Sequence, residues 1–203
     1  MKFNPDSSFF RAMGTFASFV LVNLVFILTC IPLVTIGAGL AAMQRTMMLY
    51  IDNEATALTR TYWRNFKASL VLGTQTWLTV LALAAVFIFN ISFWRSSPLW
   101  FATPIMIVMI IATVVLLMIV EVLFPLVGTF KNSYRQTMKN AALMVLPSFG
   151  KVLLLIAIDA GALALFGLTR IGRAMFVIFG FAFWLYIKAF VEKKLFTKYS
   201  DKV

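Results

Sequence analysis

The segment IPLVTIGAGLAAMQRTMM, residues 31–48, follows an uncharged run at residues 12–31 and contains a proline and two glycines before its first charge at Arg45. A proline and two glycines so close together are typical of a tight reversal of the chain. Small side chains at residues 37–42 would let the returning segment pack closely against the run before it. The sequence therefore predicts that the chain turns back here, as a short span or as a re-entrant half-helix.

The composition indicates where this reversal takes place. Of 203 residues, 62% are hydrophobic and only 12% are charged, and the mean hydropathy is +0.95. A soluble domain cannot hide so much apolar surface. The chain is therefore expected to be a polytopic, all-α transmembrane helical bundle, and no linker or low-complexity tract divides residues 1–203 into more than one transmembrane domain.

Five apolar runs approach or exceed the roughly 20 residues that a membrane-spanning helix needs. They are residues 12–31, 68–94, 99–120, 152–169 and 174–191, of which the fourth contains Asp159 and the fifth contains Lys188. Residues 32–43 are too short to cross, and extending that segment to Tyr50 requires Arg45 to lie near a membrane face. We count this segment as the sixth.

The positive charges favour six segments with both termini in the cytoplasm. This arrangement leaves only Arg95, Arg170 and Arg173 of the 18 Lys and Arg outside, whereas a five-span arrangement moves Lys2 and Arg11 outside as well. The polar connections at residues 45–67 and 131–151 then face the cytoplasm, with the C-terminal tail. The outer loops, residues 95–98 and 169–173, are very short.

Few residues suit catalysis. The chain has no histidine and a single cysteine, Cys30, and it contains no phosphate-binding or ATPase motif. We therefore expect no cofactor, no metal and no enzymatic activity. The glycine of the coupling loop of ABC permeases is missing from NEATALTRTYW, residues 53–63, so we do not expect a permease. The net charge of +11 is read as a topology signal, not as a sign of nucleic-acid binding.

Three polar residues lie within or near the apolar runs. Asp159 should be protonated or have a partner, with Asn23, Thr74 or Gln75 as possible interhelical ties, or it could be a coupling site for a proton, a cation or a substrate. Glu121 lies nearer the cytoplasmic end of its run, where pairing with Lys or Arg is expected. Asn23 is expected to bond backbone groups freed around the turn at Pro32.

Two basic stripes follow the spacing of a helix on the predicted cytoplasmic side. Tyrosine, tryptophan or phenylalanine neighbours each stripe, as expected of a segment that contacts anionic lipids or docks a partner protein. The first stripe is Arg60, Arg64 and Lys67, and the second is Lys131, Arg135 and Lys139.

NLVFILTCIPLVTIGAGLAAM, residues 23–43, resembles the most characteristic segment of the YesL family of bacterial multi-pass membrane proteins, whose function is unknown. Pro32, Thr35 and Gly37 carry this family-like turn. Similar pieces follow at FFRAMGTF (9–16), YWRNFKASL (62–70) and FPLVGTFKNSYRQTMKNAALMVLP (124–147). The resemblance implies a bacterial cytoplasmic membrane and genes often placed beside carbohydrate ABC transporters, and it supplies no catalytic residue.

These observations lead to two hypotheses of different kinds. The first is a non-enzymatic accessory or assembly factor for carbohydrate uptake that docks a carbohydrate ABC transporter through its basic stripes. The alternative is a small secondary carrier or channel that uses Asp159 as an intramembrane coupling group. A polar cavity around Asp159 would favour the carrier, and a dry seam between helices would favour a structural tie.

Overall fold

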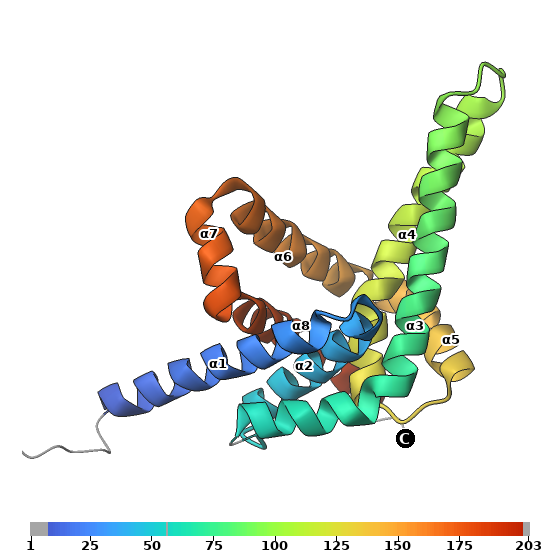
Figure 1. Ribbon diagram of the computed structural model, residues 1–203. Coiled ribbons are helices and arrows are strands. Elements are labelled where there is room, and N and C mark those ends of the chain that lie inside the picture. Colours follow the sequence, from blue (N-terminus) through green and yellow to red (C-terminus); the bar gives the residue numbers. More distant parts are fainter. Residues whose placement is uncertain (1–7, 56, 201–203) are drawn as a thin grey trace, which may run out of the picture.

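The computed structural model describes residues 8–55 and 57–200, which are helical and contain no strand. In Figure 1 the helices meet in a common centre, from which several of them extend outward. In chain order the elements are α1 (Ser8–Cys30), η1 (Leu33–Thr35), α2 (Ile36–Ile51), α3 (Leu58–Arg95), α4 (Ala102–Thr129), α5 (Tyr134–Val145), η2 (Leu146–Ser148), α6 (Phe149–Leu168), α7 (Arg170–Met175), η3 (Phe176–Gly180) and α8 (Phe181–Ser200). The elements η1 and η2 are 3₁₀-helices, and η3 is a π-helix.

Five helical stretches are long and apolar enough to cross a membrane, so the five predicted spans are confirmed. The fourth joins α5, η2 and α6, and the fifth joins α7, η3 and α8. The candidate spans are Ala12–Cys30, Leu58–Arg95, Ala102–Thr129, Tyr134–Leu168 and Arg170–Thr197. The large apolar side chains exposed along these helices are those expected of a surface that faces lipid.

The predicted reversal of the chain takes place between α1 and α2. Pro32 precedes the single 3₁₀ turn η1, and Figure 1 shows α2 running back beneath α1. With 16 residues, α2 is roughly 24 Å long at 1.5 Å per residue, which is less than a hydrocarbon core of about 30 Å. The crossing of the membrane by α2, and the cytoplasmic placement of both termini, stay predictions.

Helix α2 forms the centre of the molecule, because it packs against α1, α3, α4 and α8. A Cβ atom on Gly37 would lie 2.4 Å from the carbonyl oxygen of Gly73 in α3, and one on Gly128 in α4 would lie 2.3 Å from that of Ala41. The small residues of α2 therefore hold α3 and α4 close within one chain. Of the predicted contacts with α1, Gly39 makes one, since a Cβ there would lie 2.8 Å from the sulfur of Cys30.

Helices α3 and α4 form an antiparallel hairpin that extends away from the centre (Figure 1). Helix α3 has 38 residues, roughly 57 Å, which is longer than the hydrocarbon core is thick. Helix α4 is continuous through Pro125, although a proline inside a helix often kinks or breaks it.

Three segments predicted as connections are partly helical. The basic segment before residue 68 is the first part of α3, and the chain between α2 and α3 is limited to residues 52–57. Helix α5 lies within the connection predicted at residues 131–151, and α7 begins at Arg170, inside the predicted outer loop. Lys2 and residues 201–203, which enter the charge count, lie outside the described residues.

Candidate functional site

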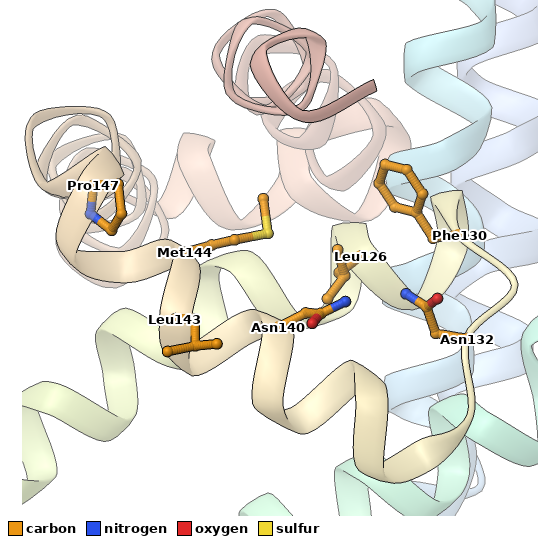
Figure 2. Close-up of a pocket in the computed structure, with 7 residues that line it drawn as sticks. All are labelled: Leu126, Phe130, Asn132, Asn140, Leu143, Met144 and Pro147. Carbon is orange, nitrogen blue, oxygen red and sulfur yellow. The ribbon is translucent and has the colours of Figure 1, made fainter. Parts of the chain in front are cut away.

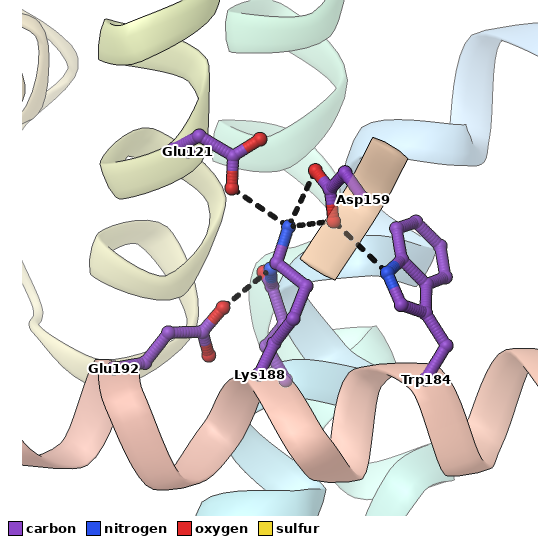
Figure 3. A network of polar contacts seen from close by, with 6 residues as sticks. Glu121, Asp159, Trp184, Lys188 and Glu192 are labelled. Carbon is purple, nitrogen blue, oxygen red and sulfur yellow. Dashed lines mark hydrogen bonds and ion pairs between the residues drawn. The ribbon is translucent and has the colours of Figure 1, made fainter. Parts of the chain in front are cut away.

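Four ionisable side chains meet where α4, α6 and α8 approach one another, and we call them the charged centre: Glu121, Asp159, Lys188 and Glu192. The Lys188 Nζ atom donates to Glu121 Oε2 at 2.7 Å and to Asp159 Oδ2 at 2.9 Å, and Asp159 Oδ1 is also 2.9 Å away. Lys188 and Glu192 are 4% and 1% exposed. Figure 3 shows the carboxylates of Glu121 and Asp159 converging on the lysine from different helices.

Asp159 lies in a seam between α6 and α8. Besides Lys188, it accepts a hydrogen bond from Trp184 Nε1 at 2.9 Å, and the Lys188 ammonium lies 5.2 Å from the centre of the Trp184 ring. The predicted partners Asn23, Thr74 and Gln75 are therefore wrong. The pairing of Glu121 with a lysine is confirmed, although the lysine belongs to the last helix.

Glu192 extends the charged centre to α2. Its Oε1 atom accepts a hydrogen bond from Gln44 Nε2 at 3.0 Å, and Gln44 is 3% exposed. Within the described residues, Glu192 Oε2 and Gln44 Oε1 are the two buried side-chain oxygens with no hydrogen-bond partner. Buried polar atoms are nearly always bonded, so an orphaned pair in one contact requires an explanation.

The sequence carries one signal for this centre, on the last helix. Trp184, Lys188 and Glu192 are spaced four residues apart, which places them on one face of α8. That spacing shows which residues of α8 act together. It does not show that α4 and α6 bring their carboxylates to the same face. The spacing of residues within one helix does not determine which other helices pack against it.

Asn23 forms a second buried polar node, between α1 and the region where η3 meets α8. Its Nδ2 atom donates to the carbonyl oxygens of Phe176, at 3.1 Å, and Val177, at 2.8 Å, and its Oδ1 atom accepts from the backbone N–H of Ala182 at 3.0 Å. The expected bonds to the Pro32 turn are therefore wrong. Asn23 instead forms hydrogen bonds with backbone groups in and just after the π-helix, where the regular pattern of α-helical hydrogen bonds is interrupted.

The family-like turn is held by other residues. Thr35 Oγ1 donates to the carbonyl oxygens of Thr29, at 2.6 Å, and Pro32, at 2.8 Å. Trp77 Nε1 donates to the Leu33 carbonyl at 2.7 Å, which ties the turn to α3. Together with the close contact at Gly37, these bonds fix the start of α2 and so the position of Gln44 two turns later.

The first basic stripe lies on the exposed side of the start of α3. Arg60, Arg64 and Lys67 line a groove of about 560 Å³ with Trp63, which is 45% exposed. The Lys67 ammonium lies 5.6 Å from the centre of the Trp63 ring. Glu54 also lines this groove, and within the described residues it forms no ion pair with these three cations.

The second basic stripe begins outside its helix. Lys131 precedes α5, whereas Arg135 and Lys139 lie on it, and all three are exposed. Beside this stripe, residues from the end of α4 and from α5 to η2 surround a groove of about 350 Å³ (Figure 2). Its lining residues are Leu126, Phe130, Asn132, Asn140, Leu143, Met144 and Pro147.

The fold and these sites define a multi-pass helical membrane protein with a buried charged centre. Residues 19–91 match the model of a family described as "Protein of unknown function, DUF624", so the chain is similar to that family over α1, α2 and most of α3. The matched part contains Asn23, Gln44 and the first basic stripe, and it ends before Glu121. No curated protein and no solved structure matches the chain.

Proposed function

We propose that this chain is a member of the YesL family and acts as a non-enzymatic accessory or assembly factor for carbohydrate uptake in the bacterial cytoplasmic membrane. The proposed family membership is supported by the family match over residues 19–91 and by the resemblance of the Pro32 turn. The association with carbohydrate transport follows from the gene context that the YesL resemblance implies.

The observation that carries the docking role is the groove of the first basic stripe. Three cations and an exposed tryptophan gather there, and the one acidic residue of the lining, Glu54, forms no ion pair with them among the described residues. Exposed tryptophan and arginine are enriched where proteins bind one another. A partner that presents acidic side chains to this groove would neutralise charges that the chain itself leaves open.

The test is capture of the tagged protein from its native host in mild detergent after chemical cross-linking, with cells grown on a glycan as the inducing carbon source. We expect a permease or ATPase subunit of a carbohydrate ABC transporter to be recovered, cross-linked near Lys67 or Lys131. Recovery of the chain with copies of itself alone would contradict the proposal.

A matched pair of variants makes this test specific. The double variant Arg60→Glu, Arg64→Glu reverses the sign of the charge in the groove. It should abolish capture of the transporter. Arg170→Glu with Arg173→Glu, which changes the same number of arginines at the far end of α6, should leave capture unchanged. Equal capture by both variants would remove the groove from the docking role.

The second candidate, a small secondary carrier, is favoured by the charged centre. Ionisable residues buried at membrane depth are expensive and commonly mark ion or substrate pathways. In this reading Asp159 is the coupling group, and Asp159→Asn in proteoliposomes should abolish substrate flux. Unchanged flux would remove Asp159 from the mechanism.

A further inference from the structure

The charged centre contains more acid than base. Three carboxyl groups, those of Glu121, Asp159 and Glu192, surround the single ammonium of Lys188. If all four groups were ionised, the centre would carry two net negative charges among side chains that are largely shielded from water. An uncompensated charge in such surroundings is costly, so at least one further positive charge belongs to this centre.

The neighbouring helices do not provide that charge. In the described chain, the charged groups that act on Glu192 are Lys188 on its own helix, Glu121 on α4 and Asp159 on α6. From α2 comes the neutral amide of Gln44, and α1 contributes Asn23, whose amide is occupied by backbone groups. The missing charge must therefore come from solution.

A proton fits this position better than a metal ion does. Among residues 8–55 and 57–200, no group of three or more Asp, Glu, Cys or His side chains could hold a metal ion. A proton needs only one oxygen that can carry it and a nearby acceptor. Glu192 Oε2 is an oxygen of this kind without a hydrogen-bond partner, and Gln44, whose Oε1 also has none, already contacts the same carboxyl group.

The contacts also indicate which carboxyl group carries the proton. Glu121 and Asp159 each accept directly from the Lys188 ammonium, which stabilises their ionised forms. Glu192 makes no ion pair at hydrogen-bond distance, and its hydrogen-bond partner is the uncharged amide of Gln44. It is also the least exposed of the three. We propose that Glu192 and Gln44 form a proton-binding site, in which Glu192 is protonated at neutral pH.

This site would couple a proton to the contact between α2 and α8. Loss of the proton would place an additional anion beside Glu121 and Asp159, on the face of α8 that Gln44 of α2 contacts. The inference does not depend on the docking role, because it concerns the interior of the chain. It gives the carrier alternative a specific ion, the proton, and a second residue beside Asp159.

The test is infrared difference spectroscopy of the protein in lipid nanodiscs, following the C=O stretch of protonated carboxyl groups as the pH is raised from neutral. We expect wild type to show this band at neutral pH and to lose it at alkaline pH. Glu192→Gln should lack the band, and Glu54→Gln, which changes an exposed glutamate, should keep it. A wild type without the band, or a Glu192→Gln protein that keeps it, would overturn the proposal.

Two further arms keep the result unambiguous. Gln44→Leu leaves Glu192 in place and removes its hydrogen-bond partner, so the band should persist at a shifted frequency even if Glu192→Gln does not fold. An unshifted band in Gln44→Leu would place the proton elsewhere. Replacing choline with sodium in the buffer should leave the wild-type band unchanged. Loss of the band in sodium would show that a metal cation competes for the site and would overturn a dedicated proton site.

Discussion

The two buried polar nodes of this molecule contrast in how their requirements are met. At Asn23, one neutral amide donates twice and accepts once, and each partner is a backbone group of η3 or α8. At the charged centre, one ammonium donates to two carboxylates, and a third carboxyl group accepts a hydrogen bond from Gln44. Two side-chain oxygens there have no hydrogen-bond partner. The first node is complete within the chain and the second is not.

This difference separates a structural tie from a site that can respond to its surroundings. A neutral node with paired groups has no reason to change state when ions or protons become available. A node with excess acid changes its charge, and therefore its energy, when a proton arrives or leaves. Both nodes involve the helix α8 or its π-helical entry, so substitutions can compare them within one molecule.

The largest effect should follow removal of the only cation of the charged centre. Lys188→Met leaves the carboxylates of Glu121 and Asp159 without a cation, and breaking a buried pair in this way costs about 3–5 kcal/mol. We expect a large fall in the apparent melting temperature of the protein in nanodiscs. Lys193→Met is the matched control, because its pair with Asp52 is partly exposed and such pairs contribute about 0–1 kcal/mol. Equal losses in the two variants would show that the charged centre is not a special node.

A smaller effect is expected at the neutral node. Asn23→Leu leaves the carbonyls of Phe176 and Val177 and the N–H of Ala182 without their side-chain partner, at a cost of about 1–3 kcal/mol. Asn90→Leu is the control, since Asn90 bonds only the Val86 carbonyl on its own exposed helix face. Thermal unfolding in nanodiscs measures both. A loss for Asn23→Leu no greater than for Asn90→Leu would mean that the node does not hold η3 in place.

The smallest effect is expected for Glu192→Gln, and Glu121→Gln is the variant to compare it with. Glu121→Gln removes a carboxylate that takes a direct bond from Lys188, and hydrogen bonds to charged groups contribute about 1.5–3 kcal/mol. Glu192→Gln replaces a protonated carboxyl with an amide of similar shape, so it should cost about 1 kcal/mol or less. Unfolding of the two variants at neutral pH gives the comparison. A greater loss for Glu192→Gln would indicate that Glu192 is ionised.

Much of the fold could be predicted from the sequence, because long apolar runs and small residues act locally. The five spans and the reversal at Pro32 follow from such patterns. The helical starts of α3 and α7 were missed because their charges resemble those of loops, although helices can extend beyond a membrane. Helix α4 continues through Pro125 because a proline costs less where neighbouring helices surround the backbone.

The site was predicted less well, and for a physical reason. Asp159 and Glu121 were recognised because a charge in an apolar run is conspicuous. Their shared partner Lys188 was visible in the sequence only as an interruption of the last span, and Gln44 looked like the end of an apolar segment. The approach of α2, α4, α6 and α8 depends on close contacts such as Gly128 with Ala41, which join residues far apart in the chain.

The most direct test of the contrast is the stability of wild type and Glu192→Gln in nanodiscs between about pH 6 and about pH 9, where exposed glutamates are ionised and lysines are still charged. The folded centre holds a proton that a water-exposed Glu192 would release, so the folded state binds more protons and its stability falls as pH rises. We predict that wild type loses stability across this range and that Glu192→Gln loses much less. Parallel pH profiles for the two proteins would contradict the account, because Glu192 would then hold no proton that depends on folding.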